Sequence, residues 1–214
     1  SLGIPQTLEA AVEAFASGRI TAVDMASANG APFVHQFSVG MHARMVQLRE
    51  KMEFGSRLGK MGASARAAWM TLKNPKAMAG ELTVDDVELT TRATGIGITN
   101  NLFGEGHLPY ADDPAGGTLG IYVTVARQRS ELLRFALVLG RGRWRDSPHV
   151  EVHETTRATL KLGGRRRWPA VMDGELVRLE PETRFEIHPA ALKVLVPGAG
   201  QGQGTRAPPA APRS

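Results

Sequence analysis

Two acidic residues flank a glycine in the stretch Val171-Met172-Asp173-Gly174-Glu175-Leu176. On an extended chain, residues two positions apart point to the same side, so Asp173 and Glu175 would share one face. Asp173 could then take a proton from a bound hydroxyl group, with Glu175 orienting it or tuning it. Asp-Gly is also a strong signal for a two-residue hairpin turn, which would give the same residues a purely structural role. These residues alone leave both interpretations open.

The composition excludes several classes of site. The chain has 214 residues, of which 42% are hydrophobic, and this suits a packed globular core. It has no cysteine, which excludes disulfides, thiol nucleophiles and cysteine metal ligands. No apolar run approaches the roughly 18 residues that span a bilayer. The first five residues lack a signal-peptide pattern and are typical of the middle of a chain, so we expect a fragment of a longer protein.

Positive charge is concentrated in one segment. Residues 141–170 carry eight Arg or Lys against three acidic residues, an excess equal to the whole net charge of +5. Such a patch suits an anionic membrane, a phosphate-bearing ligand or nucleic acid, although a solvated face is the alternative. Trp144 and Trp168 lie among these arginines, as at membrane interfaces, although Trp168 also fits a core position. The charge alone leaves these interpretations open.

The apolar pattern predicts an α+β, mostly β fold. Helical spacing of apolar residues predicts helices over 7–17, 43–53, 57–72 and 130–138. Asn29-Gly30 predicts a hairpin between strands 20–26 and 33–39. Further strands are predicted at 81–91, 94–99, 118–125, 148–162, 167–173, 183–188 and 191–196. Many short strands at close spacing favour an antiparallel β-sandwich, and residues 198–214 have the composition of a disordered tail.

Two other groups of polar residues are weaker candidates for a site. His149, Glu151 and His153 alternate with valines, so one strand face carries three potential metal ligands, although a solvated outer face is the favoured interpretation. Asn100 and Asn101 either line a cleft or end a strand. We predict no metal site from these residues.

Four short blocks follow one another along the chain, at residues 2–5 with 18–24, 33–43, 99–111, and 173–175 with 185–197. In this order they resemble the diacylglycerol kinase and sphingosine kinase-like lipid kinases, including the bacterial branch. The resemblance implies that residues 20–197 are the C-terminal, substrate-side β lobe of the diacylglycerol kinase / NAD kinase-like fold. Residues 1–19 would end the N-terminal nucleotide lobe, and 198–214 would follow as a tail.

The resemblance also implies roles for the two carboxylates. Asp173 would be the general base that deprotonates a lipid hydroxyl, and Glu175 would support it. ATP and Mg²⁺ would be bound mainly by the N-terminal lobe, whose Gly-Gly-Asp-Gly-Thr loop is not found in this sequence. The family often holds a structural magnesium with an Asp-Gly-Leu-Leu run. The matching run here starts at Ala115-Gly116 and lacks the acid, although Asp112 and Asp113 lie just before it.

The expected function is therefore transfer of the ATP γ-phosphate to a lipid hydroxyl such as that of diacylglycerol, by a cytoplasmic protein peripheral at the membrane. As a fragment alone, the chain is expected to be inactive. One alternative is a non-catalytic lipid- or membrane-binding module, and another is a kinase of a soluble nucleotide cofactor. The expected partners are the lipid substrate and an anionic membrane surface, and no nucleic acid. The identity of the acceptor lipid and a homo-oligomeric state are left open.

Overall fold

The computed structural model describes residues 4–5, 7–50, 62, 66, 69–71, 75–104, 110–126, 128–140, 147–163 and 168–197. Most of the predicted helix 57–72 lies outside these residues. So do the basic residues at 141–145 and 165–167, and the predicted tail at 198–214.

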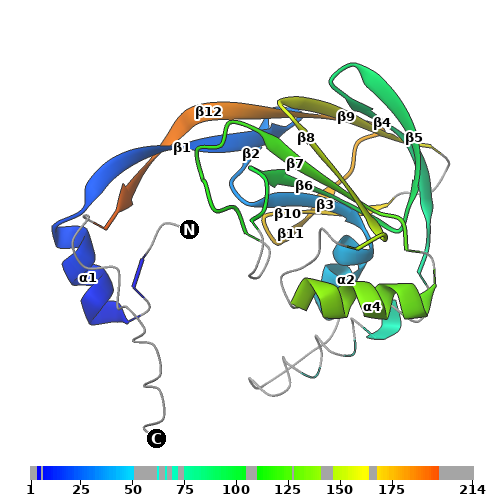
Figure 1. Cartoon of the computed structure of the whole chain (residues 1–214), viewed down its shortest axis with the longest axis horizontal. Coiled ribbons are helices and arrows are strands. Elements are labelled where there is room, and N and C mark those ends of the chain that lie inside the picture. The colour runs from blue at the N-terminus through cyan, green and yellow to red at the C-terminus, as the bar shows by residue number, and fades with distance from the viewer. Residues whose placement is uncertain are drawn as a thin grey trace, which may run out of the picture.

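Two six-stranded antiparallel sheets make up the body of the molecule (Figure 1). Sheet A has the strand order β2-β1-β12-β9-β4-β5, with bounds β2 Ala31–Phe33, β1 Arg19–Ala28, β12 Glu182–Val196, β9 Arg157–Leu162, β4 Met78–Val84 and β5 Val87–Ala93. Sheet B has the order β11-β10-β3-β6-β7-β8, with bounds β11 Glu175–Arg178, β10 Pro169–Met172, β3 Gln36–Gly40, β6 Gly95–Asn100, β7 Leu119–Thr124 and β8 Val150–Thr155. The predicted mostly β, antiparallel sandwich is therefore confirmed.

The core lies between the two sheets. Strand side chains alternate, so every second residue of each strand points inward. Ile96 and Ile98 of β6 are buried against Leu82 of β4 and other apolar side chains of sheet A. Phe37 of sheet B meets Phe185 of sheet A edge to face, with ring centroids 5.1 Å apart. This pair joins the two layers near the strands that lead to the acidic hairpin.

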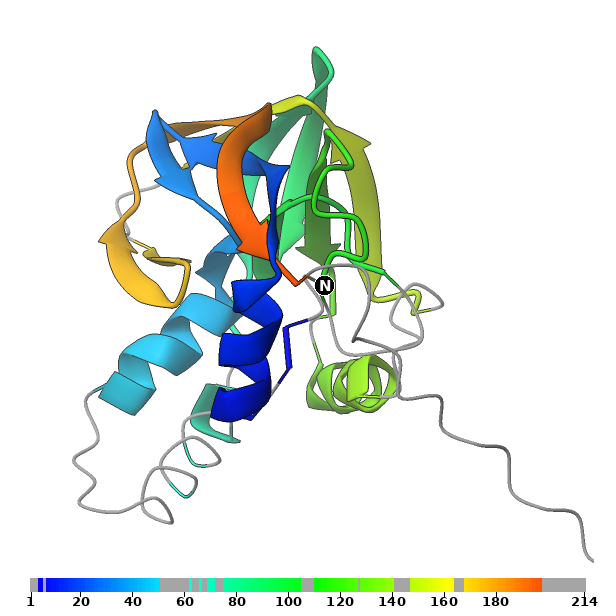
Figure 2. The same ribbon diagram turned by 90° about the vertical axis from the view of Figure 1, so that its left-hand side faces the viewer.

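Three helices are described, and all lie on the same side of the sandwich (Figures 1 and 2). They are α1 Leu8–Ala16, α2 Met41–Glu50 and α4 Arg129–Gly140. Helix α2 buries Ala43 and Val46 against Val171 of β10. Gly40 joins β3 to α2 with φ 86°, and a Cβ there would lie 2.6 Å from the Thr94 carbonyl oxygen. Within the described residues, no helix combines the length and apolar character needed to cross a bilayer.

A two-stranded arm projects from the sandwich toward α1 (Figure 1). It consists of the first half of β1 and the last part of β12, which pair from Val23↔Leu192 to Arg19↔Val196. A β-bulge interrupts their register between Val23 and Met25, where the arm meets the body. Bulges bend a strand locally, so the arm leaves the sheet at an angle set by this point.

The chain changes sheet at two places where one continuous strand was predicted. The predicted strand 33–39 breaks, because β2 ends at Phe33 in sheet A and β3 begins at Gln36 in sheet B. The predicted strand 148–162 breaks at Thr156, between β8 in sheet B and β9 in sheet A. Both sides of each break keep a β pattern, so the pattern alone does not reveal the crossing.

Other predicted strand bounds were also wrong. The predicted strand 81–91 is the β4–β5 hairpin, which turns at Asp85 and Asp86, both with positive φ. The predicted strands 183–188 and 191–196 form one strand, β12, which continues through Ala190 with φ 54°. Strand β11 was not predicted at all.

Candidate functional site

Asp173 and Gly174 are the two central residues of the β10–β11 hairpin. Their φ angles are 48° and 93°, and Met172 pairs with Glu175 across the turn. Two positive φ values are typical of a type I′ turn, in which an Asp-Gly pair is favoured. The hairpin interpretation is therefore correct as local geometry. The expectation that Asp173 and Glu175 share a face of an extended strand is wrong, because a turn separates them.

The carboxylate of Asp173 is bound by three successive backbone N–H groups. The N–H of Val34 donates to Oδ2 at 2.8 Å, while those of His35 and Gln36 donate to Oδ1 at 2.9 and 3.0 Å. The backbone N–H of Asp173 donates in return to the Gln36 carbonyl at 2.9 Å. We call this set of four bonds the Asp173 clasp. It ties the β10–β11 turn to the segment where the chain passes from sheet A to sheet B.

Asn100 holds the same segment from its carbonyl side. Its backbone N–H donates to the His35 carbonyl at 3.0 Å. Its side-chain Nδ2 donates to the Val34 carbonyl at 3.1 Å and to the Asp24 carbonyl at 2.9 Å. Residues 34–36 are thus fixed on both sides. Asn100 is the last residue of β6, as the strand-ending interpretation predicted. Its buried Oδ1 has no hydrogen-bond partner in the part of the chain that the structure describes.

Asp24 is a buried carboxylate for which the sequence analysis proposed no role. Its side chain is 2% exposed. Oδ2 accepts the N–H of Gly117 at 2.7 Å and Oδ1 accepts the N–H of Ala190 at 2.8 Å. Asp24 sits at the β1 bulge, so these bonds hold the base of the arm, the bend in β12 and the loop before β7 together. An aspartate inside the apolar run Ala22-Val23-Asp24-Met25-Ala26 is the signal that could have identified it.

A short aromatic stack lies beside the clasp. The ring of His35 stacks on Phe103 with centroids 5.8 Å apart, and Phe103 stacks on Tyr122 at 5.3 Å. The Tyr122 hydroxyl also accepts the Phe103 backbone N–H at 2.7 Å. Tyr122 lies on β7 and is partly buried. Through Phe103, the stack links the segment at His35 to β7.

The clasp leaves limited acceptor capacity for chemistry. A carboxylate has about four lone-pair positions, and three are used by backbone donors. One position remains, on Oδ2, and the Asp173 side chain is exposed. Glu175 is also exposed, at the start of β11, and its side chain makes no hydrogen bond to other described residues. The arrangement offers one oriented proton acceptor with a second carboxylate nearby.

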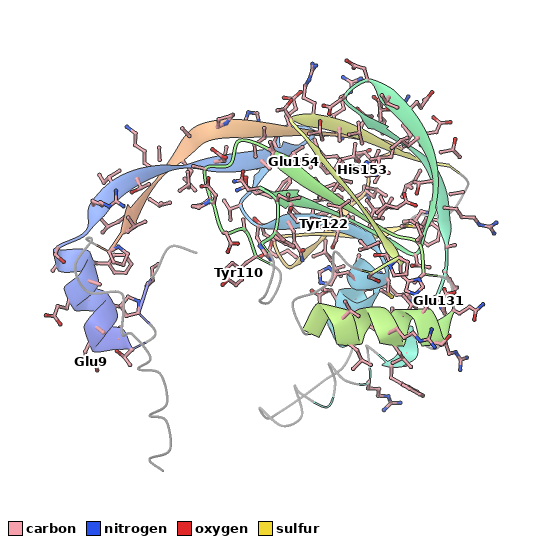
Figure 3. All side chains as sticks on the ribbon, viewed as in Figure 1. Glu9, Tyr110, Tyr122, Glu131, His153 and Glu154 are labelled. Carbon is pink, nitrogen blue, oxygen red and sulfur yellow. The ribbon has the colours of Figure 1, made fainter. Side chains whose placement is uncertain are left out.

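The remaining candidates do not form a metal centre among the described residues. No group of three His, Asp or Glu side chains that could hold a metal is found there. His153 lies on β8 beside Glu154 (Figure 3), and Glu154 accepts the Thr118 hydroxyl at 2.8 Å. Asp113 closes a local turn by accepting the Ala115 N–H at 2.8 Å. Among the residues that the structure describes, no cluster of carboxylates replaces the acid missing at Ala115-Gly116.

The domain is similar to a known protein family and to several solved structures. Residues 35–196 match the model of the YegS C-terminal NAD kinase beta sandwich-like domain. Three structures from Bacillus anthracis str. Sterne are similar over 90% of this chain. Two are described as proposed diacylglycerol kinases, with 19% and 18% identity and TM-scores of 0.64 and 0.65, and one as a diacylglycerol kinase, with 15% identity and a TM-score of 0.61. This chain spans 60–62% of their length.

Proposed function

This chain belongs to the family of YegS C-terminal NAD kinase beta sandwich-like domains, and we propose that it is the substrate-side lobe of a lipid kinase. The reaction is transfer of the ATP γ-phosphate to a lipid hydroxyl such as that of diacylglycerol. The description of similar structures as diacylglycerol kinases supports this choice. The observation that carries the proposal is the Asp173 clasp, which presents one oriented carboxylate at an exposed turn.

In the proposed step, Asp173 accepts the proton of the lipid hydroxyl through the remaining position on Oδ2. The hydroxyl oxygen attacks the γ-phosphorus, the bond to the bridging oxygen breaks, and ADP leaves. Phosphoryl transfer depends mainly on positioning, and the three backbone donors keep the carboxylate in one orientation before the substrate arrives. Glu175 supports the base from the neighbouring strand.

ATP and Mg²⁺ are proposed to be bound mainly outside this lobe. Mg²⁺ would neutralise charge on the transferring phosphates. The described residues do not fit a magnesium site of their own, because no three carboxylate or histidine side chains converge. No step of the proposed mechanism in this chain therefore passes through a metal ligand.

A membrane-facing side is proposed from the exposed apolar residues on the helices. Leu8 and Val12 are exposed one turn apart on α1, as are Leu133 and Leu137 on α4, and Trp69 is also exposed. Both helices lie on the same side of the sandwich (Figure 2). Large exposed apolar side chains of this kind mark interaction surfaces, and an insoluble substrate requires contact with a bilayer. The protein would thus work at the cytoplasmic membrane surface.

The test is transfer of labelled phosphate from ATP in a protein carrying both this lobe and a nucleotide lobe. Diacylglycerol in mixed micelles and soluble NAD are offered as separate acceptors. We expect the unchanged protein to produce labelled lipid, and we expect the Asp173→Asn variant to lose this labelling. Labelling of NAD without labelling of lipid would favour the kinase of a soluble cofactor. Lipid binding with no transfer to either acceptor would favour the non-catalytic module.

A further inference from the structure

Among the described strands, β5 is the longest that ends a sheet (Figure 1). The other three end strands are β2 in sheet A and β11 and β8 in sheet B. β5 has seven residues, whereas β8 has six, β11 has four and β2 has three. An edge strand presents unpaired backbone N–H and C=O groups, and the strand of another chain can pair with them.

The β4–β5 hairpin determines which backbone groups of β5 face outward. Its turn at residues 85–86 has positive φ at both positions, as in a type I′ turn, so Val87 donates its N–H to the Val84 carbonyl. Every second residue of β5 after Val87 bonds to β4 in the same way. The backbone groups of the residues between them face the open edge. These residues are Glu88, Thr90 and Arg92, and all three are exposed.

The outward-facing residues are self-complementary about Thr90. When two copies of β5 lie antiparallel with Thr90 opposite Thr90, Glu88 of each copy lies opposite Arg92 of the other. Within one chain, Glu88 pairs with Thr83 and Arg92 pairs with Ala79, so neither charge faces an opposite charge across the hairpin. Neither makes an ion pair with another described residue. Opposite charges directly across two strands attract, and this register brings them together twice.

The other three edges fit a second copy less well. β2 contains Pro32, which has no N–H to donate. Antiparallel self-pairing of β8 over its full length would place Glu151 opposite Glu154, and like charges directly opposite each other repel. β11 offers only four residues. Length and charge together therefore favour β5 as the edge that takes a partner strand.

We propose that a second copy of this chain pairs with β5 in antiparallel orientation, about a twofold axis at Thr90. The two six-stranded copies of sheet A would then form one continuous sheet, with two backbone hydrogen bonds for each pair of outward-facing residues. Val87, which is 59% exposed, would lie beside Ala93 of the second copy. No residue of the Asp173 clasp lies on β5, so this inference does not rest on the proposed kinase function.

Sedimentation velocity of the 214-residue chain tests the proposal at concentrations from about 1 to about 300 µM, a range suited to a small interface. The expected result is a reversible monomer–dimer equilibrium. Glu88→Arg would place like charges opposite each other, and so would Arg92→Glu. Each variant should therefore dimerise at least about tenfold more weakly than the parent. The two variants change the net charge in opposite directions, so a loss in both does not come from overall charge.

Mixing the two variants is the decisive measurement. In a mixed pair every charge at these positions again faces an opposite charge, so the mixture should form a heterodimer about as tight as the parent dimer. Glu151→Arg reverses an exposed acid on β8 as the matched control, and it should change the affinity by less than about threefold. Circular dichroism checks that every variant is folded.

Four outcomes would overturn the proposal. The parent chain could remain monomeric over the whole concentration range, or the single variants could dimerise as tightly as the parent. The folded mixture could form no heterodimer, which would exclude the register about Thr90. An equal loss in Glu151→Arg would assign the association to another surface or to overall charge.

Discussion

Replacing Asp173 with asparagine should lower the free energy of unfolding by about 1–2 kcal/mol, although the two side chains have nearly the same shape. Asn keeps one carbonyl oxygen, which can still accept the N–H groups of His35 and Gln36. Its NH₂ group would replace Oδ2 and face the N–H of Val34, a donor against a donor. All three bonds also lose the charge of the carboxylate. The value stays modest because the turn is exposed and water can reach the Val34 N–H.

For a domain of this size, 1 kcal/mol corresponds to about 2–4 °C in melting temperature, so Asp173→Asn should melt about 2–8 °C lower. Circular dichroism melts of the chain alone are sufficient. Glu175→Gln is the matched control, because the Glu175 side chain makes no hydrogen bond to other described residues. Its stability should stay within about 0.5 kcal/mol of the parent. An Asp173→Asn melt within about 1 °C of the parent would show that the clasp contributes nothing to stability.

The same two variants separate stability from catalysis in a protein with both lobes. Loss of a general base typically lowers kcat by about 10²–10⁴-fold. Asp173→Asn should show this loss at temperatures well below its melting point, and Glu175→Gln should show a smaller one. An Asp173→Asn enzyme that is less stable yet fully active would leave Asp173 as a structural clasp only.

Four further outcomes are expected. The 214-residue chain alone should not transfer phosphate from labelled ATP to lipid, because its sequence has no Gly-Gly-Asp-Gly-Thr loop to hold the donor; detectable transfer would contradict this. Asp24→Asn should cost about 2–4 kcal/mol in urea unfolding, since a buried NH₂ would face an N–H donor. Gly40→Ala should lower the melting temperature, because its Cβ would lie 2.6 Å from a carbonyl oxygen at a positive φ, and an unchanged melt would contradict the described bend. Changing the three arginines at 165–167 to Glu should weaken sedimentation with anionic vesicles at low salt, by about 1 kcal/mol per Arg, whereas unchanged sedimentation would indicate an ordinary solvated face.

The sequence was sufficient for the fold class and for most helices and strands. Local signals succeeded where the structure is local, as at Asn29-Gly30, which forms the predicted β1–β2 hairpin. They failed where a strand crosses from one sheet to the other, at residues 34–35 and at Thr156, because both sides of the crossing remain extended. The turn at Asp85-Asp86 was missed because it places two non-glycine residues at positive φ.

The sequence predicted the residues of the candidate site but not their hydrogen-bond partners. Asp173 and Glu175 stand out because of their type and spacing. The partners of Asp173 are backbone groups 137–139 residues away in the chain, so no local pattern indicates them. Peptide N–H groups also occur at every non-proline residue, so the Val34–Gln36 donors carry no sequence signal of their own. Asp24 was visible as an acid in an apolar strand, but its contacts with Gly117 and Ala190 required the three-dimensional structure.

The arm formed by β1 and β12 has a mechanical consequence. Five residue pairs separate its tip from the bulge at Asp24, a length of about 15 Å. The arm is therefore a lever with its fulcrum at the bulge, and a rotation of about 10° there moves the tip by about 3 Å. Reacting groups misplaced by about 1 Å can lose about 100-fold in rate. The two hydrogen bonds to the buried Asp24 carboxylate hold the base of the arm, and they therefore help to fix the position of α1 at its tip.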